Sequence, residues 1–244
     1  MDNSSAMRAT IAAAATFVLA TTLLAGCSAA PEPPSPSTVP SESPSSAPTP
    51  TVEPIDTVVA IVARPEALEL RDASGGVVVE LGYLGDVDSA IATIEGALGA
   101  APVDEEYPGS SHVPPSTAHR WGAFELWEHR YVDNWADFAT QERTLYMPSF
   151  GIMFTGPEVA GVALTTEQGV VAGSSWSVLE AMPGLQENPS GCSGPYLDFT
   201  SRDVTWPDGT VHEERHGVDF VATDDRSAIE RVRAPLQVNQ ESCA

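Results

Sequence analysis

The chain has 244 residues, with 34 acidic and 11 basic side chains and five histidines, and its formal charge at pH 7 is −23. Every basic side chain is an arginine, because the sequence contains no lysine. Such an acidic chain repels the phosphates of nucleic acids and of anionic lipids, which argues against nucleic-acid binding and against attraction to a membrane by surface charge.

The N-terminus has the pattern of a secretory signal peptide. Arg8 precedes an apolar run over residues 11–24, and small residues follow the run. The run has about 14 residues, fewer than the roughly 20 that cross a bilayer as a helix. Met7 would serve as the start as well as Met1, since it leaves Asp2 out of the basic region. We therefore expect residues 1–26 to be a cleaved signal peptide.

The last residues of this run, Leu24-Ala25-Gly26-Cys27, resemble the lipobox of bacterial lipoproteins. The resemblance implies cleavage before Cys27, attachment of acyl chains such as palmitate to that cysteine, and a protein anchored at the outer face of the cytoplasmic membrane. The arginine-only composition, rich in Ala, Val and Gly, is typical of a high-GC genome. With its lipobox and the Pro/Ser tether that follows, the chain resembles the surface lipoproteins of actinobacteria.

Residues 27–54 form a segment rich in Pro, Ser and Thr, in which Val39 and Val52 are the only large apolar side chains. Such a segment cannot bury enough apolar surface to offset the entropy that it would lose on ordering. We expect a disordered tether with polyproline II character, which holds the folded part away from the membrane.

The remaining residues, 55–244, suffice for one large domain or two small ones. In the first half, β-branched and alternating runs predict strands over 57–62, 67–71, 77–81 and 120–128. Apolar residues at helical spacing predict a helix over 86–98. Asp86 or Asp88 is its expected N-cap, and Gly99 suits the left-handed position after its end.

The second half of the chain shows a similar order of elements. Strands are predicted over 150–155, 162–165, 170–172, 196–200, 210–216, 217–222 and 229–232, and a short helix over 176–182. Pro65-Glu66 and Pro157-Glu158 occupy corresponding positions in the two halves. The pattern indicates a weak internal duplication, although any α+β chain can show such an order.

We therefore predict an α+β fold of two sheet-plus-helix halves, residues 55–147 and 148–244. Each half is expected to be an antiparallel sheet with one short helix packed on it. In architecture alone, tandem units of this kind resemble the β-lactamase-inhibitor-protein family. No motif carries that family's activity over to this chain.

Two cysteines remain once Cys27 is assigned to the anchor. Cys192 and Cys243 form an even pair in an exported protein, and neither has a C-x-x-C neighbour for metal binding or redox work. We predict a disulfide between them, which would tie the C-terminus to the loop over residues 190–194.

The stretch His212-Glu213-Glu214-Arg215-His216 matches the H-E-x-x-H pattern of zinc metalloproteases. That chemistry needs a helix that brings His212 and His216 to one metal, with Glu213 as general base. A Pro-Asp-Gly turn before the stretch and Gly217 after it favour a strand, on which the two histidines would lie about 13 Å apart. We therefore reject a metal at this motif and predict no cofactor.

An aromatic cluster spans residues 119–138. If residues 120–128 form one strand, Trp121 and Trp127 share a face with Glu125. Exposed tryptophans beside acidic groups are suited to stacking on the sugar rings of a cell wall, whereas buried ones would be core. The candidate ligand-binding residues of this cluster are Trp121, Trp127, Tyr131 and Trp135.

No catalytic residues are predicted, because the sequence lacks a G-x-S-x-G elbow, a Walker loop and a dinucleotide fingerprint. We expect a non-catalytic binding or interaction module of the cell envelope, anchored through Cys27, with a cell-wall or protein partner. Two alternatives stay open. One is an envelope hydrolase, and the other is a carrier of lipid or of a small ligand, which would need an apolar cavity between sheet and helix.

Overall fold

The computed structural model describes residues 55–110, 114–130, 147–189, 191, 193–205 and 209–238. The chain divides into two units, Met1–Thr49 and Pro50–Ala244, and all of the described residues belong to the second unit. The predicted signal peptide and tether, and the cysteines Cys27, Cys192 and Cys243, lie outside the described residues.

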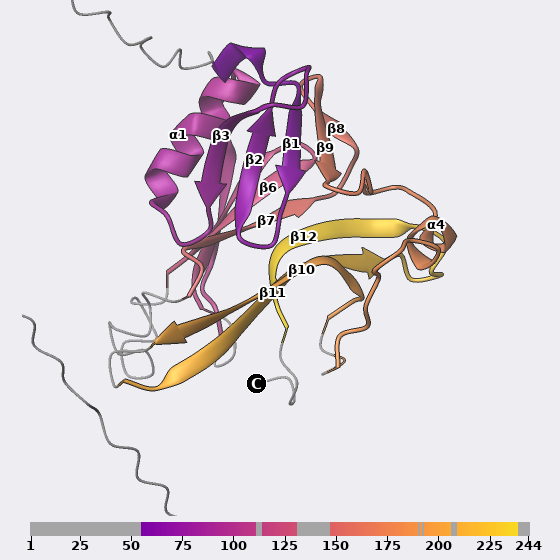
Figure 1. Cartoon of the computed structure of the whole chain (residues 1–244). Coiled ribbons are helices and arrows are strands. Elements are labelled where there is room, and N and C mark those ends of the chain that lie inside the picture. Colours follow the sequence, from indigo (N-terminus) through magenta and orange to yellow (C-terminus); the bar gives the residue numbers. More distant parts are fainter. Residues whose placement is uncertain are drawn as a thin grey trace, which may run out of the picture. The chain divides into compact units, whose positions relative to one another are not determined.

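Strands dominate the described part of the chain and form two sheets (Figure 1). The first half contributes η1 (Ile55–Thr57), β1 (Ala60–Ala63), β2 (Ala67–Arg71), β3 (Val77–Gly82), α1 (Val87–Leu98), β4 (Val103–Tyr107), β5 (Ser116–Trp121) and β6 (Phe124–His129). The second half contributes β7 (Phe150–Phe154), β8 (Glu158–Val159), β9 (Val162–Thr166), α4 (Trp176–Glu180), β10 (Tyr196–Thr205), β11 (Val211–Ala222) and β12 (Ile229–Gln237).

Both sheets combine strands from the two halves of the chain. The five-stranded sheet has the order β3-β2-β1-β9-β8, and the seven-stranded sheet has the order β10-β11-β12-β7-β6-β5-β4. β1 and β9 run parallel, with Ala60 opposite Ala163, whereas the other neighbours are antiparallel. The two halves therefore share main-chain hydrogen bonds in each sheet.

The predicted α+β fold of two sheet-plus-helix halves is wrong. The protein is mainly β, its sheets cross the expected boundary at residue 148, and α4 has only five residues. Among the described residues, each half does have three strands, a helix and three further strands in that order. The equivalent strands pair differently, however, because β1 pairs with β2 whereas β7 pairs with β6 and β12. Alternation in a sequence reports which side chains share a face, and it carries no information about which strands become neighbours.

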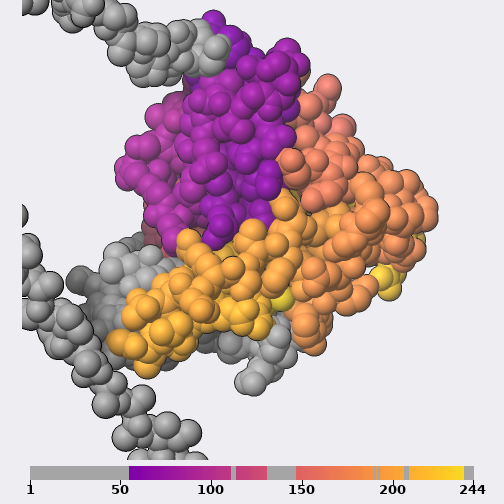
Figure 2. All heavy atoms as spheres, viewed as in Figure 1, coloured from indigo at the N-terminus to yellow at the C-terminus, as the bar shows by residue number. Residues whose placement is uncertain are grey.

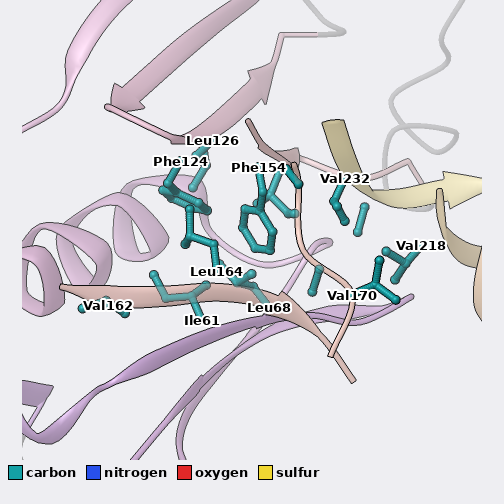
Figure 3. Packing of buried hydrophobic residues seen from close by; sticks show 14 of the residues in the cluster. Ile61, Leu68, Phe124, Leu126, Phe154, Val162, Leu164, Val170, Val218 and Val232 are labelled. Carbon is teal, nitrogen blue, oxygen red and sulfur yellow. The ribbon is translucent and has the colours of Figure 1, made fainter. Parts of the chain in front are cut away.

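The hydrophobic core lies between the two sheets (Figure 3). Ile61, Leu68 and Leu164 of the five-stranded sheet face Phe124, Leu126 and Phe154 of the seven-stranded sheet, and all six are fully buried. The α1 helix adds Ala90, Ile94 and Leu98 to the same cluster.

The α1 helix confirms the predicted caps. The Asp86 side chain accepts a hydrogen bond from the backbone N–H of Ser89 at 2.8 Å, which satisfies one of the free donors of the first turn. Gly99 ends the helix with φ of 68°, a left-handed conformation that glycine adopts without steric cost. No helix of the described part is long and apolar enough to span a bilayer.

The strand predicted over residues 120–128 is in fact a hairpin. The chain reverses at Gly122, with φ of 66°, so that Trp121 ends β5 and Phe124 begins β6. A second boundary also differs, since the predicted break at Gly217 falls inside β11, which is one strand of 12 residues. The strand predicted over residues 170–172 is absent, and these residues lie in the loop before α4.

Candidate ligand-binding groove

The outer face of the seven-stranded sheet, on the side away from the core, carries a row of polar and aromatic side chains. Register partners lie side by side on one face of a sheet. One row of such partners crosses six strands, from β4 to β11: Val103, Arg120, Glu125, Met153, Arg233 and Asp219. A neighbouring row pairs Trp127 with Gly151.

Two hollows lie along this face, and Trp127 and Met153 line both of them. The first has a volume of about 870 Å³, which includes space open to solvent, and is also lined by Tyr107, Arg120 and Arg231. The second has a volume of about 700 Å³ on the same basis and is also lined by His129, Ser193, Asp219 and Arg233. We call the two hollows together the outer groove. Trp127 and Met153 stand between them, so a ligand that occupies both must cross these two side chains.

The side of the outer groove nearest β4 is a fixed aromatic and ionic cluster. The Trp127 indole N–H donates to Glu125 Oε2 at 2.8 Å, and Arg120 Nε donates to Glu125 Oε1 at 3.0 Å. Arg120 Nη2 donates to the Tyr107 hydroxyl at 2.9 Å. The Tyr107 and Trp127 rings lie 4.8 Å apart between centroids, and Arg120 Cζ lies 5.9 Å from each ring.

These contacts hold the Trp127 ring in one orientation. Both oxygens of Glu125 are used, one by the indole and one by the guanidinium. The hydrogen bonds that Arg120 donates to Tyr107 and Glu105 raise the pKa of Arg120 above its usual range, so its charge is permanent. An aromatic side chain that is already ordered loses little conformational entropy when a ligand binds to it.

The opposite side of the outer groove is an ion pair between β11 and β12. Arg233 Nε donates to Asp219 Oδ1 at 3.2 Å, and Arg233 Nη2 pairs with Oδ2. The Asp219 side chain is only 2% exposed, whereas that of Arg233 is 38% exposed. Burial raises the pKa of Asp219, and Arg233 opposes that rise. Arg231, also on β12, is 43% exposed and pairs with its chain neighbour Glu230 at 3.2 Å.

The end of the outer groove near β6 contains His129 and Gly151. Burial lowers the pKa of His129 to about 4, so the ring is neutral at pH 7. Its Nδ1 lies 3.3 Å from the Ser116 hydroxyl. A β-carbon at position 151 would lie 3.3 Å from the Ala234 carbonyl oxygen and 3.6 Å from His129 Nε2. Glycine at this position therefore keeps the floor beside Trp127 open.

The structure separates the predicted aromatic residues. Trp127 lines the outer groove, whereas Trp121 is 5% exposed and belongs to the core. The Trp121 ring packs on Phe124 at 5.6 Å, and its N–H donates to the Ala100 carbonyl at 2.7 Å. The expectation that Trp121 and Trp127 share a face fails because Gly122 reverses the chain between them. Tyr131 and Trp135 lie outside the described residues.

The H-E-x-x-H stretch lies on β11, so the predicted strand is confirmed. His212 and Glu213 are exposed, whereas His216 is buried at 7% exposure. Glu213 accepts a hydrogen bond from Ser201 and pairs with Arg215, contacts across and along the hairpin. No group of three or more His, Cys, Asp or Glu side chains in the described ranges is placed to hold a metal ion.

Several groove residues were missed by sequence reasoning. Tyr107, Arg120, Met153, Asp219 and Arg233 come from five strands and share no motif. The sequence did hold one signal. Along β6 and β7, the side chains Glu125, Trp127 and Met153 alternate with apolar side chains that face the core. That signal identifies outward positions, but only the strand order brings them together.

Comparison of the chain with protein-family models, with curated proteins and with solved structures finds no match.

Proposed function

We propose that the protein is a non-catalytic, lipid-anchored binding module of the cell envelope, and that its outer groove binds a saccharide chain. In this proposal Cys27 holds the protein at the outer face of the membrane, and Trp127 provides the stacking surface. The observation that carries the proposal is the position of Trp127, which lies between two hollows whose walls contain both carboxylates and guanidinium groups.

The chemistry of the groove suits sugars. A sugar ring presents C–H groups on its faces and hydroxyls around its rim. An aromatic side chain packs against the C–H groups, and carboxylates and guanidinium groups form hydrogen bonds with the hydroxyls. Arg120 and Glu125 lie beside Trp127 on one side, and Arg233 and Asp219 lie on the other. Two adjacent hollows that share Trp127 and Met153 can accommodate consecutive residues of a saccharide chain.

The filled interior favours this proposal over the carrier alternative. A lipid carrier encloses its cargo between its layers. Here the space between the two sheets is occupied by packed side chains such as Phe124, Phe154 and Leu164, each fully buried (Figure 3). The hollows described above lie on the outside of the sheet.

The proposal is tested by binding to isolated peptidoglycan and, in solution, to an N-acetylated oligosaccharide such as chitotetraose, measured by calorimetry with the full chain. We expect Trp127→Ala to weaken binding at least tenfold, about 1.4 kcal/mol, because a central aromatic side chain contributes more than its neighbours.

Phe199→Ala is the matched control. Phe199 is another partly exposed aromatic residue, at 39%, but it lies on β10 against Tyr196 and lines neither hollow. We expect the control to bind as the wild type does. Equal binding by Trp127→Ala and the wild type, or no saccharide binding by the wild type, contradicts the proposal.

A further inference from the structure

A separate pocket lies where β10 and β11 pass the ends of β1–β3. Figure 2 shows this region from outside, where the indigo surface of the N-terminal strands meets the orange surface of β10 and β11. The pocket encloses about 490 Å³ of space that opens to the surface. We call it the seam pocket. Apart from Pro235, it shares no lining residue with the outer groove.

The walls of the seam pocket are mainly apolar and rigid. Five of its nine lining residues are Pro65, Tyr83, Leu84, Pro148 and Pro235. Tyr83 is 2% exposed and is fixed by an edge contact with Phe150 at 5.4 Å, whereas Leu84 is 44% exposed. Proline has no side-chain rotamers to lose, so an apolar group can enter with little ordering of the walls.

His216 is the polar group set into this wall. Its side chain is on β11 and only 7% of the residue is exposed. Within the described residues, no hydrogen bond reaches its ring, although Glu214, Arg202 and Glu66 act on it electrostatically. The ring of His216 lines the seam pocket, so a molecule in the pocket can supply the hydrogen-bond partner that a buried polar group normally has.

The charges around His216 favour a cation. Glu66 on the β1–β2 connection lies 3.4 Å from Arg202, and Arg202 on β10 lies 3.1 Å from Glu214 on β11. Glu66 and Arg202 line the pocket, whereas Glu214 lies behind Arg202 and does not, and the three groups together carry one negative charge in excess. Burial lowers the pKa of His216, so its ring is neutral at pH 7 and can accept a hydrogen bond.

We propose that the seam pocket binds a small organic amine, with the apolar body of the ligand between Pro65, Leu84 and Pro148 and its protonated amino group donating to the ring of His216 near Glu66. The ligand class follows from the shape and charge of the pocket. A neutral molecule of the same shape lacks the attraction to Glu66, and an anion is disfavoured by the net negative charge of Glu66, Arg202 and Glu214.

The test uses three probes with a similar phenyl body: 2-phenylethylamine, 2-phenylethanol and 3-phenylpropionate. Each is titrated into the full chain while the imidazole resonances are followed by NMR. We expect 2-phenylethylamine to shift the His216 resonances with a dissociation constant on the order of 1 mM, as is usual for a ligand of this size. The alcohol should bind at least fivefold more weakly, and the carboxylate should leave the resonances unchanged.

Variants of Glu66 and His216 separate the contributions of these two side chains to amine binding. Glu66 is 45% exposed at its side chain, so Glu66→Gln should fold normally and should reduce the preference for the amine over the alcohol. His216→Gln should weaken amine binding, whereas His212→Gln, an exposed histidine on the same strand, should not. Acidification should also weaken amine binding, because a protonated His216 can no longer accept the hydrogen bond.

No shift of the His216 resonances with the amine, or equal affinity for the amine, the alcohol and the carboxylate, overturns the proposal. Saccharide binding at the outer groove is measured with different ligands and different variants, so its success or failure does not affect this test.

Discussion

At the residue scale, His129 gives the protein a predictable response to acid. Its pKa is about 4 in the folded protein, below the ordinary value of 6.5, because burial disfavours the charged ring. In the unfolded chain the ring takes up a proton first as the pH falls, so acid favours unfolding. The stability that depends on neutral His129 is therefore full above pH 6.5 and is lost progressively toward pH 4.

We predict that the free energy of unfolding, measured by urea denaturation, falls between pH 6.5 and pH 4 by up to about 3 kcal/mol from this residue. Burial lowers the pKa of His216 as well, so it acts in the same direction. His129→Gln should flatten the pH dependence in this window, and the exposed His212→Gln should leave it unchanged. An unchanged slope in His129→Gln would refute this assignment.

Substitutions at the Arg233–Asp219 ion pair should have unequal effects on the free energy of unfolding. Arg233→Met removes the partner of a carboxylate that is 2% exposed, and we expect a loss of about 2 kcal/mol at pH 7, moderated by the partial exposure of Arg233. Adding Asp219→Asn removes the unpaired charge and should restore most of that loss. A double-mutant cycle by chemical denaturation measures the coupling, and strict additivity of the two substitutions would show that the pair is energetically independent.

Sequence reasoning at this scale selected both Trp127 and Trp121 as candidate ligand-binding residues, but the two residues have opposite environments. Both are tryptophans in one aromatic cluster, so composition could not distinguish them. The difference comes from Gly122, whose left-handed backbone turns the chain and places Trp121 in the core. Arg233 and Asp219 had no sequence signal as a pair, because they lie 14 positions apart on two strands.

At the element scale, α1 was the most predictable feature, because its determinants are local. Apolar spacing, a capping aspartate and a terminal glycine are all read within about 14 residues of one another. The β5–β6 hairpin was missed although it is equally local. A lone glycine between two aromatic runs is compatible with either a turn or a strand, and only pairing of the two runs decides between them.

The capping aspartate gives a direct prediction for α1. Asp86→Ala removes the hydrogen bond to the Ser89 N–H, and we expect a loss of about 1 kcal/mol in unfolding free energy. Asp88→Ala is the matched control, because Asp88 is in the first turn and interacts with the helix dipole but does not cap it. Its effect should be less than half as large. Equal losses in the two variants would show that Asp86 acts only through its charge.

At the scale of the whole molecule, the arrangement of strands was beyond sequence reasoning. β1 and β9 are separated by about 100 residues, and their parallel pairing depends on neither a turn nor a spacing motif. The repeated order predicted from the sequence included a strand over residues 170–172, which is absent, and the described second half has β8 before β9 in its place. No sequence pattern indicated that each sheet would combine strands from both halves of the chain.

This topology predicts that neither half folds alone. Residues 55–147 without the second half lose β9 beside β1 and β7 beside β6, which exposes two strand edges and the inner faces of both sheets. We expect this fragment to unfold without a cooperative transition, whereas residues 50–244 should show a single one by circular dichroism. Cooperative unfolding of the fragment would contradict the shared-sheet architecture.

The central claim is that the outer groove holds a saccharide across Trp127, and intermolecular nuclear Overhauser effects test it most directly. With chitotetraose bound to the full chain, we predict effects between the Trp127 indole protons and sugar ring protons, with further contacts at Met153 between the two hollows. Contacts confined to residues outside the outer groove, or a sugar that shows none with Trp127, would contradict the account.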